Sequence, residues 1–348
     1  MRALTVTPLK PGSVEVSEVE PPVAGEGELL VDGVAVGVCG TDREIARGDY
    51  GEAPPGEERL VLGHESLGRV REAPPGSGFA PGDLVVGVVR RPDPVPCGAC
   101  ARGEFDMCRN GRFTERGIKG VHGYGAQRWT VEADYAVGID PELERVGVLL
   151  EPATVVAKAW EHIERIGGRS WFEPRRLLVT GAGPIGLLAA LLGTQRGLDV
   201  HVLDRVGAGA KPGLVAGLGA AYHTAPVSEV TARTRPDVVI EATGAPDVVL
   251  NVVADNARAG IVCLTGVSSG GPRTGVDAGA LNRGIVLEND VVFGSVNANL
   301  RHYGLAALAL ARADRSWLER MITRRLPLDR ALEAFEPDGD EVKTVIDL

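Results

Sequence analysis

The sequence has no long hydrophobic run and few aromatic residues. No apolar stretch among its 348 residues reaches the roughly 18 needed to cross a bilayer, so we expect no membrane partner. Only 4% of the residues are aromatic, which argues against an aromatic-lined pocket for a bulky apolar molecule. No low-complexity tract occurs, which argues against extended disorder. The first residues, MRALTVTPLKPG, lack the apolar segment of a secretory signal, so we expect a cytoplasmic protein.

Positive charge is in deficit, and the cysteines cannot all be paired. The chain has 37 Lys and Arg against 47 Asp and Glu, a net charge of −10 that repels phosphate backbones, so we expect no nucleic-acid partner. The five cysteines are an odd number, and three of them lie within twelve residues. Clustered cysteines in a chain without a signal more often bind a metal than form disulfides. The cysteines are Cys39, Cys97, Cys100, Cys108 and Cys263.

The composition is that of a globular protein with two cores. Hydrophobic residues make up 44% of the chain and charged residues 24%. At roughly 150 residues per domain, the length predicts two domains. Residues 1–152 are rich in Gly, Pro and Val, and their short apolar runs, such as 29–38, 68–71 and 83–90, are separated by turn residues. This pattern predicts a β-rich, barrel-like domain.

The pattern of apolar segments changes at about residue 153. Short apolar strands alternate with helical segments up to residue 297, which is typical of βαβ units and a doubly wound parallel sheet, and the fold class is therefore α/β. The predicted strands are 175–180, 199–204, 237–241, 260–266 and 290–294, and the predicted helices are 184–196 and 213–220. Residues 298–348 predict helices over 307–322 and 328–335 and a last strand over 342–348.

A glycine-rich turn joins the first of these strands to its helix. The segment Gly181-Ala-Gly183-Pro184-Ile185-Gly186 is a G-x-G-x-x-G motif in the strand–turn–helix context that a dinucleotide site requires. Gly181 permits the tight turn, Gly183 lets the pyrophosphate approach, and Gly186 lets the helix pack closely on the sheet. The motif predicts a nicotinamide dinucleotide cofactor, with a ligand-free glycine turn as the alternative.

An acidic residue ends the next strand. Asp204 lies 23 positions after Gly181, where a carboxylate can bind both ribose hydroxyls of NAD and repel a 2′-phosphate. Arg205 follows and would favour NADP or stack on adenine, so NAD is the expected cofactor and NADP the alternative. Further candidates for contact with the cofactor follow the later strands, where the carboxyl ends of a doubly wound sheet line the nicotinamide pocket. They are Thr243, Gly266, Val267 and Asn297.

Four residues of the first zone have the chemistry of a zinc site. Cys39 lies in GVCGTD, His64 and Glu65 in GHE, and Glu151 in LLEPATVV. Thiolate, imidazole and carboxylate are zinc ligands, and three protein ligands with one open position make a catalytic site. Taken singly, each residue has a simpler explanation, such as a core cysteine, a buried histidine or a helix cap, so spacing alone leaves the site open.

The ordered set GVCGTD, GHE, Glu151-Pro and GAGPIG resembles the zinc-dependent medium-chain dehydrogenase/reductase family along nearly the whole chain. The segments GTDREI, ERGIKGVHGYGAQ and GSVNANLRHY are similar to its glucose dehydrogenase branch. The resemblance implies a GroES-like catalytic domain over 1–152 and 298–348, and a Rossmann domain over 153–297. It also implies a homodimer or a homotetramer.

The resemblance also implies roles for single residues. It places the catalytic zinc on Cys39, His64 and Glu151, with Glu65 beside the metal. The alternative in this branch is that Glu65 is the ligand and Glu151 is reached through water. Thr41 matches the hydroxyl of the family's proton relay, and Glu44 stands where many relatives have the relay's solvent-side histidine, so it either accepts the proton or is only a solvated acid. Glu115 and Asn297 match positions that contact sugar hydroxyls or the cofactor.

The cysteine cluster resembles a shortened structural zinc lobe. Relatives carry four cysteines there, whereas this chain has Cys97, Cys100 and Cys108. A fourth ligand would have to be an oxygen of Asp106, Glu104 or Asp93; otherwise the site is lost. Cys263, in a predicted buried strand, is expected to be a core residue.

Together these features predict a zinc- and NAD(P)-dependent alcohol or sugar dehydrogenase (EC 1.1.1). The expected substrate is a small polyhydroxy molecule, an aldose such as glucose that is oxidised to its lactone. Relatives carry an Asp where this chain has Val155, and a His where it has Leu287, which weakens the assignment to glucose itself. The alternatives are a polyol, cyclitol or aminocyclitol dehydrogenase of a biosynthetic pathway, and a non-catalytic sensor of NAD(P)H or zinc.

Overall fold

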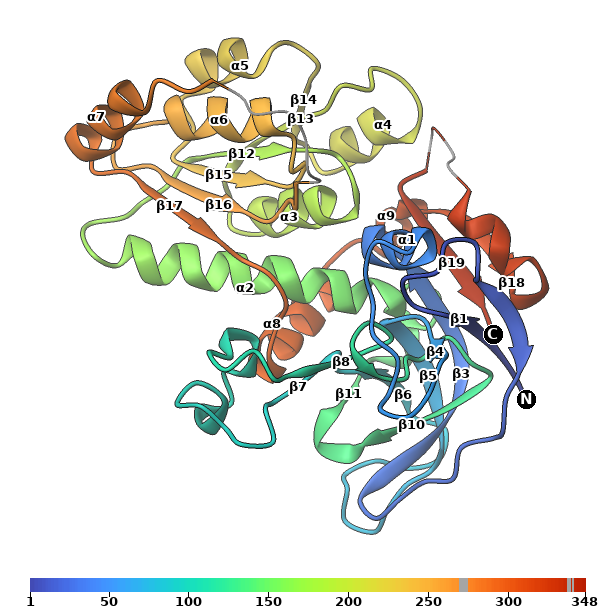
Figure 1. Ribbon diagram of the computed structural model, residues 1–348. Helices are drawn as coiled ribbons and strands as arrows, with labels where there is room; N and C mark the ends of the chain where they lie inside the picture. Colours follow the sequence, from blue (N-terminus) through green and yellow to red (C-terminus); the bar gives the residue numbers. More distant parts are fainter. Residues whose placement is uncertain (269–274, 337–338, 340) are drawn as a thin grey trace. The chain divides into compact units, whose positions relative to one another are not determined.

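The computed structural model describes residues 1–268, 275–336, 339 and 341–348. The chain forms two compact units. The first unit comprises Met1–Thr154 and Asn297–Leu348, and the second comprises Val155–Val296. The long helix α2 (Leu150–Gly167) carries the chain from the first unit into the second (Figure 1).

Short strands make up most of the first unit. Its strands are β1 (Arg2–Val6), β2 (Glu15–Glu18), β3 (Glu28–Val38), β4 (Leu60–Val61), β5 (Glu65–Glu72), β6 (Leu84–Gly87), β7 (Arg90–Arg91), β8 (Thr114–Arg116), β9 (Gly120–Val121), β10 (Arg128–Glu132), β11 (Ala136–Gly138), β18 (Ile322–Pro327) and β19 (Lys343–Asp347). Its α-helices are α1 (Gly40–Arg47), α8 (Leu300–Ala311) and α9 (Arg315–Met321). Its 3₁₀ helices are η1 (Cys100–Arg102), η2 (Phe105–Met107), η3 (Ala133–Tyr135), η4 (Pro141–Leu143), η5 (Gly147–Leu149) and η6 (Leu328–Phe335).

The C-terminal tail is an inner strand of the largest sheet in this unit. That sheet has the order β11-β6-β5-β3-β19-β18, and β10 also pairs with β3. β19 is antiparallel to β3 and parallel to β18. The unit is thus the expected GroES-like β-rich domain, closed by residues from the far end of the chain. Two smaller sheets, β2-β1-β4 and β7-β8-β9, complete it.

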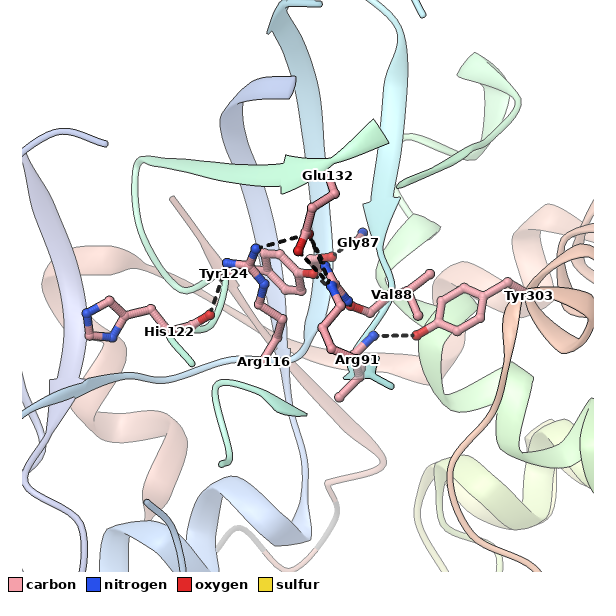
Figure 2. A network of polar contacts seen from close by, with 10 residues as sticks. Gly87, Val88, Arg91, Arg116, His122, Tyr124, Glu132 and Tyr303 are labelled. Atoms are coloured by element: carbon pink, nitrogen blue, oxygen red, sulfur yellow. Dashed lines mark hydrogen bonds and ion pairs between the residues drawn. The ribbon is translucent and has the colours of Figure 1, made fainter. Parts of the chain in front are cut away.

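A polar network joins three short strands of the first unit (Figure 2). Arg91 on β7 donates to Glu132 on β10 at 2.7 Å, and Arg116 on β8 contacts the same carboxylate at 3.4 Å. Tyr124 donates its hydroxyl to the carbonyl of Val88 at 2.8 Å. The Glu132 carboxylate thus gives a charged partner to two buried arginines, since both Arg91 and Arg116 are about 8% exposed.

A single parallel sheet organises the second unit. Its strands are β12 (Arg176–Thr180), β13 (Asp199–Leu203), β14 (Ala221–His223), β15 (Val238–Glu241), β16 (Ile261–Leu264) and β17 (Val291–Gly294). Its helices after α2 are α3 (Pro184–Thr194), α4 (Ala210–Gly217), α5 (Val227–Thr234), α6 (Pro246–Ala254) and α7 (Ala278–Glu288). The order β14-β13-β12-β15-β16-β17 is that of the doubly wound dinucleotide-binding sheet.

The sequence of the second unit explains why this sheet is covered on both faces. β12 (RLLVT) and β15 (VVIE) are continuous buried runs, as expected of parallel strands without a solvent face. Figure 1 shows α5 and α6 above the sheet and α3 on its other face. α3 (PIGLLAALLGT) is apolar nearly all round and buried over most of its length, as a core helix must be. The predicted α/β class and its doubly wound sheet are confirmed.

Several predicted elements differ from the structure. Residues 307–322 are not one helix, because α8 ends at Ala311 and α9 starts after Asp314, whose carboxylate caps the N–H groups of Ser316 and Trp317. Residues 328–335 form a 3₁₀ helix with a kink at Arg330. The polar, half-buried β14 was missed because it has no apolar run.

Over the residues that the structure describes, no helix is both long enough and apolar enough to cross a bilayer.

Candidate active site

The start of α1 fixes the position of Cys39. The Cys39 thiol caps this helix by accepting a hydrogen bond from the N–H of Thr41 at 3.3 Å. The Asp42 carboxylate accepts one from the N–H of Cys39 at 2.9 Å, which completes a capping box. Gly48 ends the helix at φ +79°, a left-handed conformation that favours glycine. The sequence CGTD therefore holds a thiol in one orientation.

His64 and Glu65 come to this thiol from the start of β5. His64 Nε2 lies 3.1 Å from Cys39 Sγ, and ligand atoms of Cys39, His64 and Glu65 all lie within 4.8 Å of one another. His64 Nδ1 faces the Asp42 carboxylate at 3.4 Å. Burial alone would lower the pKa of His64, but Asp42 and Cys39 raise it well above its ordinary value. Asp42 thus supports both Cys39 and His64.

A buried lysine from the C-terminal strand completes the surroundings of Glu65. The Lys343 ammonium pairs with the Glu65 carboxylate and donates to the carbonyl of Val38 at 2.9 Å. Both side chains are almost fully buried, at 1% and 2% exposure. Gly37 makes room for the pair, since a Cβ there would lie 2.0 Å from the Glu65 carboxylate. Only glycine fits at this point of β3, because the Glu65 carboxylate lies so close to the backbone.

Glu151, Thr41 and Glu44 lie around this group without being part of it. Glu151, in the first turn of α2, is outside the set of three ligands. Burial raises its pKa to about 7, with His64 lowering it and Glu65 raising it further. Thr41 and Glu44 are half-buried residues of α1, two and five positions after Cys39.

The donor set fits zinc. One thiolate, one imidazole and one carboxylate are a typical zinc ligand set, and three protein ligands leave a position open for substrate or water. Asp42 beside His64 is the kind of carboxylate partner that orients a metal-binding histidine. Glu65 is thus the carboxylate that the geometry places with Cys39 and His64, in preference to Glu151.

Glu115 and Asn297, both predicted to contact sugar or cofactor, are in contact with each other. Asn297 Nδ2 donates to Glu115 Oε1 at 2.6 Å, and Arg90 donates twice to the same oxygen, at 3.1 and 2.9 Å. Asn297 has φ +61°, an unusual conformation for a residue other than glycine. Oε1 of Glu115 is therefore occupied by donors of Arg90 and Asn297, which fixes the orientation of the carboxylate.

The shortened cysteine lobe holds three thiols together. Ligand atoms of Cys97, Cys100 and Cys108 lie within 4.8 Å of one another. The backbone N–H of Arg109 donates to Cys97 Sγ at 3.4 Å, and this bond lowers the pKa of the Cys97 thiol to about 6. Asp106, predicted as an oxygen ligand, is not among the three residues whose ligand atoms lie together, and its Oδ1 accepts a hydrogen bond from Asn299 at 2.7 Å.

The glycine-rich turn of the second unit has the geometry of a phosphate cradle. Gly181 has φ +91°, and Gly183 caps α3 with no atom within 4 Å of where a Cβ would lie. A Cβ on Gly186 would lie 1.7 Å from the carbonyl oxygen of Gly181, so only glycine allows α3 to approach this closely. Pro184 and Ile185 form the first turn of α3, whose N–H groups face the turn.

Asp204 is tied to the glycine-rich turn. Its Oδ2 accepts a hydrogen bond from the N–H of Ala182 at 2.7 Å and contacts the Lys211 ammonium at 3.1 Å. Burial would raise the pKa of Asp204, but these bonds and one from the N–H of Val206 lower it. The neighbouring Arg205 is exposed. The Lys211 ammonium thus lies beside the acid that was expected to favour NAD, and the next residue in the chain is a second cation.

The loops after β15 and β16 lie against each other. Thr243 follows β15 and Gly266 follows β16, and a Cβ on Gly266 would lie 2.1 Å from the N–H nitrogen of Gly244. Val267 is 77% exposed, unusual for its type. These residues stand at the carboxyl ends of parallel strands, where such sheets bind their ligands.

Two buried charged residues at these sites were missed in the sequence. Lys343 could have been noticed as the one cation in the tail strand VKTVIDL, which is rich in Val, Ile and Leu. Glu241 ends β15 and is fully buried, but an acid at a strand end gives no signal of burial. Cys263 is buried in β16, as expected of a core residue, and burial raises the pKa of its thiol to about 12.

The chain is similar to known proteins over its whole length. Residues 144–348 match the family model "Glucose dehydrogenase C-terminus", and residues 25–141 match "Alcohol dehydrogenase GroES-like domain". It is 39% identical to a glucose 1-dehydrogenase of Methanocella arvoryzae, covering 100% of this chain and 99% of that one. A glucose 1-dehydrogenase of Thermoproteus tenax is 40% identical, with 99% of each chain covered.

A solved structure extends this similarity to the fold. The glucose dehydrogenase of Haloferax mediterranei in complex with NADP, Zn and gluconolactone is 33% identical, with a TM-score of 0.92 and coverage of 100% of this chain and 99% of that one. The first of the two family models alone covers more than half of the chain, over residues 144–348. The chain therefore belongs to the zinc-dependent medium-chain dehydrogenase/reductase family, in its glucose dehydrogenase branch.

Proposed function

We propose that this chain is a zinc-dependent glucose 1-dehydrogenase, which oxidises the anomeric hydroxyl of glucose to gluconolactone with NADP or NAD. The observation that carries the proposal is the group Cys39, His64 and Glu65. It occurs in a chain that is similar from end to end to a glucose dehydrogenase solved with NADP, Zn and gluconolactone.

Cys39, His64 and Glu65 would hold the catalytic zinc, and this chain's other residues would hold these three in place. When bound, zinc supplies a Lewis acid for the charge that develops on a hydroxyl oxygen, and the nicotinamide supplies the hydride acceptor. Asp42 fixes Cys39 through its N–H and orients the His64 ring. Lys343 restrains the Glu65 carboxylate and offsets its charge.

The sugar hydroxyls would be recognised by Glu115 and Asn297. Arg90 and Asn297 orient the Glu115 carboxylate by donating to Oε1, which directs Oε2 toward a hydroxyl donor. A site that hydrogen-bonds a hydroxyl discriminates strongly against a molecule that lacks it. The proton released by the substrate would pass to the Thr41 hydroxyl, which can accept and donate. Glu44, on the next turn of α1, would carry it toward solvent.

The dinucleotide would bind with its pyrophosphate at Gly181–Gly186 and at the start of α3. Lys211 lies 3.1 Å from Asp204, so it offsets the negative charge that would repel a 2′-phosphate. Arg205 adds a second cation at this end of the sheet. We therefore infer that NADP is accepted, beside the NAD that Asp204 favours. Thr243, Gly266 and Val267 would contact the nicotinamide half.

Cys97, Cys100 and Cys108 would hold a second, structural zinc ion. Three thiolates are suitable ligands, and water or another donor would have to complete the set.

Two further expectations stay predictions: a homodimer or homotetramer, to be tested by light scattering, and a cytoplasmic location, to be tested by fractionation.

Turnover with a substrate panel tests the proposed function. We expect the purified protein to reduce NADP and NAD with glucose, and Cys39→Ala to reduce kcat by about 1,000-fold or more, since it removes a metal ligand. Arg102→Ala, at an exposed position of η1, serves as the control. Turnover of myo-inositol or a linear polyol in place of aldoses would favour the cyclitol or polyol alternative. Full activity of Cys39→Ala would refute the catalytic zinc.

A further inference from the structure

A fully buried carboxylate, outside the residues assigned so far, lies at the centre of the dinucleotide-binding sheet. Glu241 ends β15, and its side chain has no exposed surface. In the order β14-β13-β12-β15-β16-β17, the strands after β12 are first added on one side of it, as β13 and β14, and then on the other side, as β15, β16 and β17. The switch point therefore lies between β12 and β15. Open α/β sheets bind their ligands in the crevice at this switch point.

The Glu241 side chain spans this switch point. From β12, the Thr180 hydroxyl donates to Oε1 at 3.3 Å. From the loop after β15, the N–H of Thr243 donates to Oε1 at 2.7 Å, and the N–H of Gly244 donates to Oε2 at 3.1 Å. The Thr243 hydroxyl donates to Oε1 as well. All these partners are uncharged donors, and together they hold the carboxylate in one orientation.

The backbone of Glu241 reaches the neighbouring loop. Its carbonyl accepts hydrogen bonds from the N–H groups of Thr265 and Gly266 at 2.8 and 3.0 Å, and from the Thr265 hydroxyl at 2.8 Å. A Cβ on Gly266 would lie 2.8 Å from Glu241 Oε2, so the two loops close tightly around the carboxylate. One residue thereby joins the end of β12 to the loops after β15 and β16.

We propose that Glu241 is a positioning residue for the nicotinamide half of the cofactor. The glycine-rich turn after β12 holds the pyrophosphate, and Asp204 marks the adenosine side at β13. The nicotinamide must therefore extend to the opposite side, over the loops after β15 and β16 that Glu241 organises. The inference rests on the proposed dinucleotide function, but not on the identity of the sugar.

Binding of a whole and a truncated nucleotide tests this role. The variant Glu241→Gln keeps the size but turns one acceptor into an NH₂ donor, which faces the N–H of Thr243 or Gly244. We expect the Kd for NADPH to rise by roughly 10-fold or more, because a buried donor loses its partner. The Kd for 2′-phospho-ADP-ribose, which lacks nicotinamide, should change less than about 2-fold. Glu229→Gln, exposed on α5, is the matched control.

The outcomes separate the possible failures. If Glu241→Gln weakens both nucleotides equally, or leaves NADPH binding unchanged, the positioning role is wrong. Asp204→Asn should change the Kd of both nucleotides by the same factor, because both carry the same adenosine 2′-phosphate half, and this variant calibrates the adenosine side. Wild-type protein that binds NADPH but does not oxidise glucose overturns the proposed substrate alone. If the wild type binds neither nucleotide, the proposed function and this inference both fail. A melting curve of Glu241→Gln close to that of the wild type shows that its fold is intact.

Discussion

At the scale of single residues, the ion pair between Lys343 and Glu65 links metal binding to the last strand of the chain. Both side chains are buried, so each charge depends on the other for compensation. The burial of Lys343 would lower its pKa, but Glu65 and Cys39 raise it, which keeps the ammonium charged. A zinc ion bound to Glu65 would also compensate the negative charge of its carboxylate.

We therefore predict that Lys343→Met destabilises the metal-free protein more than the zinc-loaded one. Removing one member of a buried pair costs about 3 kcal/mol. Unfolding in urea, with EDTA and with zinc, would measure this. The double variant Lys343→Met, Glu65→Gln should regain part of the loss, and Lys10→Met, at an exposed position, should change little. An equal loss with and without zinc would contradict a shared role.

At the scale of elements, the cluster of Arg91, Arg116 and Glu132 joins β7, β8 and β10 (Figure 2). Burial would raise the pKa of Glu132, but its bonds with Arg91 lower it to about 2. Because the carboxylate has a lower pKa in the folded chain than in the unfolded one, its stabilising effect is complete above its ordinary pKa of 4.5. The effect is lost progressively as the pH falls from there toward 2.

The stability difference between wild type and Glu132→Gln should therefore depend on pH. Since the Glu132 side chain is 43% exposed, solvent screening keeps the difference modest. Urea unfolding at pH 6, 4 and 3 would measure it. We expect the wild type to be the more stable at pH 6 and the difference to shrink toward pH 3. Glu142→Gln, at an exposed position of η4, is the control. A difference that is constant across this range would exclude Glu132 as the titrating group.

Elements with a strong local pattern could be predicted from the sequence, and those fixed by distant partners could not. β12 and α3 follow from an apolar run and a glycine-rich turn. β14 has no apolar run and is a strand because β13 pairs with it. The prediction of one helix over 307–322 failed because helical periodicity continued across Asp314, whose capping role depends on the break itself.

The same distinction holds for the site. Cys39, His64 and Glu65 lie in short motifs, so family resemblance identified them. Lys343 and Glu241 act through contacts with residues far away in the sequence or across a strand, as in the pairing of Lys343 with Glu65. Such contacts exist only once β19 lies beside β3. Asp106 was proposed as a ligand because it is close to the cysteines in sequence, whereas its carboxylate contacts Asn299.

At the scale of the whole molecule, the two ligand groups predict two zinc ions with separable effects. Cys39, His64 and Glu65 lie where the chemistry is proposed, whereas Cys97, Cys100 and Cys108 lie in a lobe built from two short 3₁₀ helices. A metal there would mainly stabilise the lobe, because so short a segment buries little apolar surface of its own.

We predict that Cys97→Ser, Cys100→Ser removes one zinc per chain and lowers Tm by about 5 °C while kcat with glucose stays within about 3-fold of wild type. Cys39→Ser should remove the other zinc and nearly all activity. If the sites are independent, the Tm shifts of the combined variant should add. Elemental analysis, calorimetry and turnover on the same preparations measure all three quantities. Loss of both zinc ions from either variant would show instead that the two sites depend on each other.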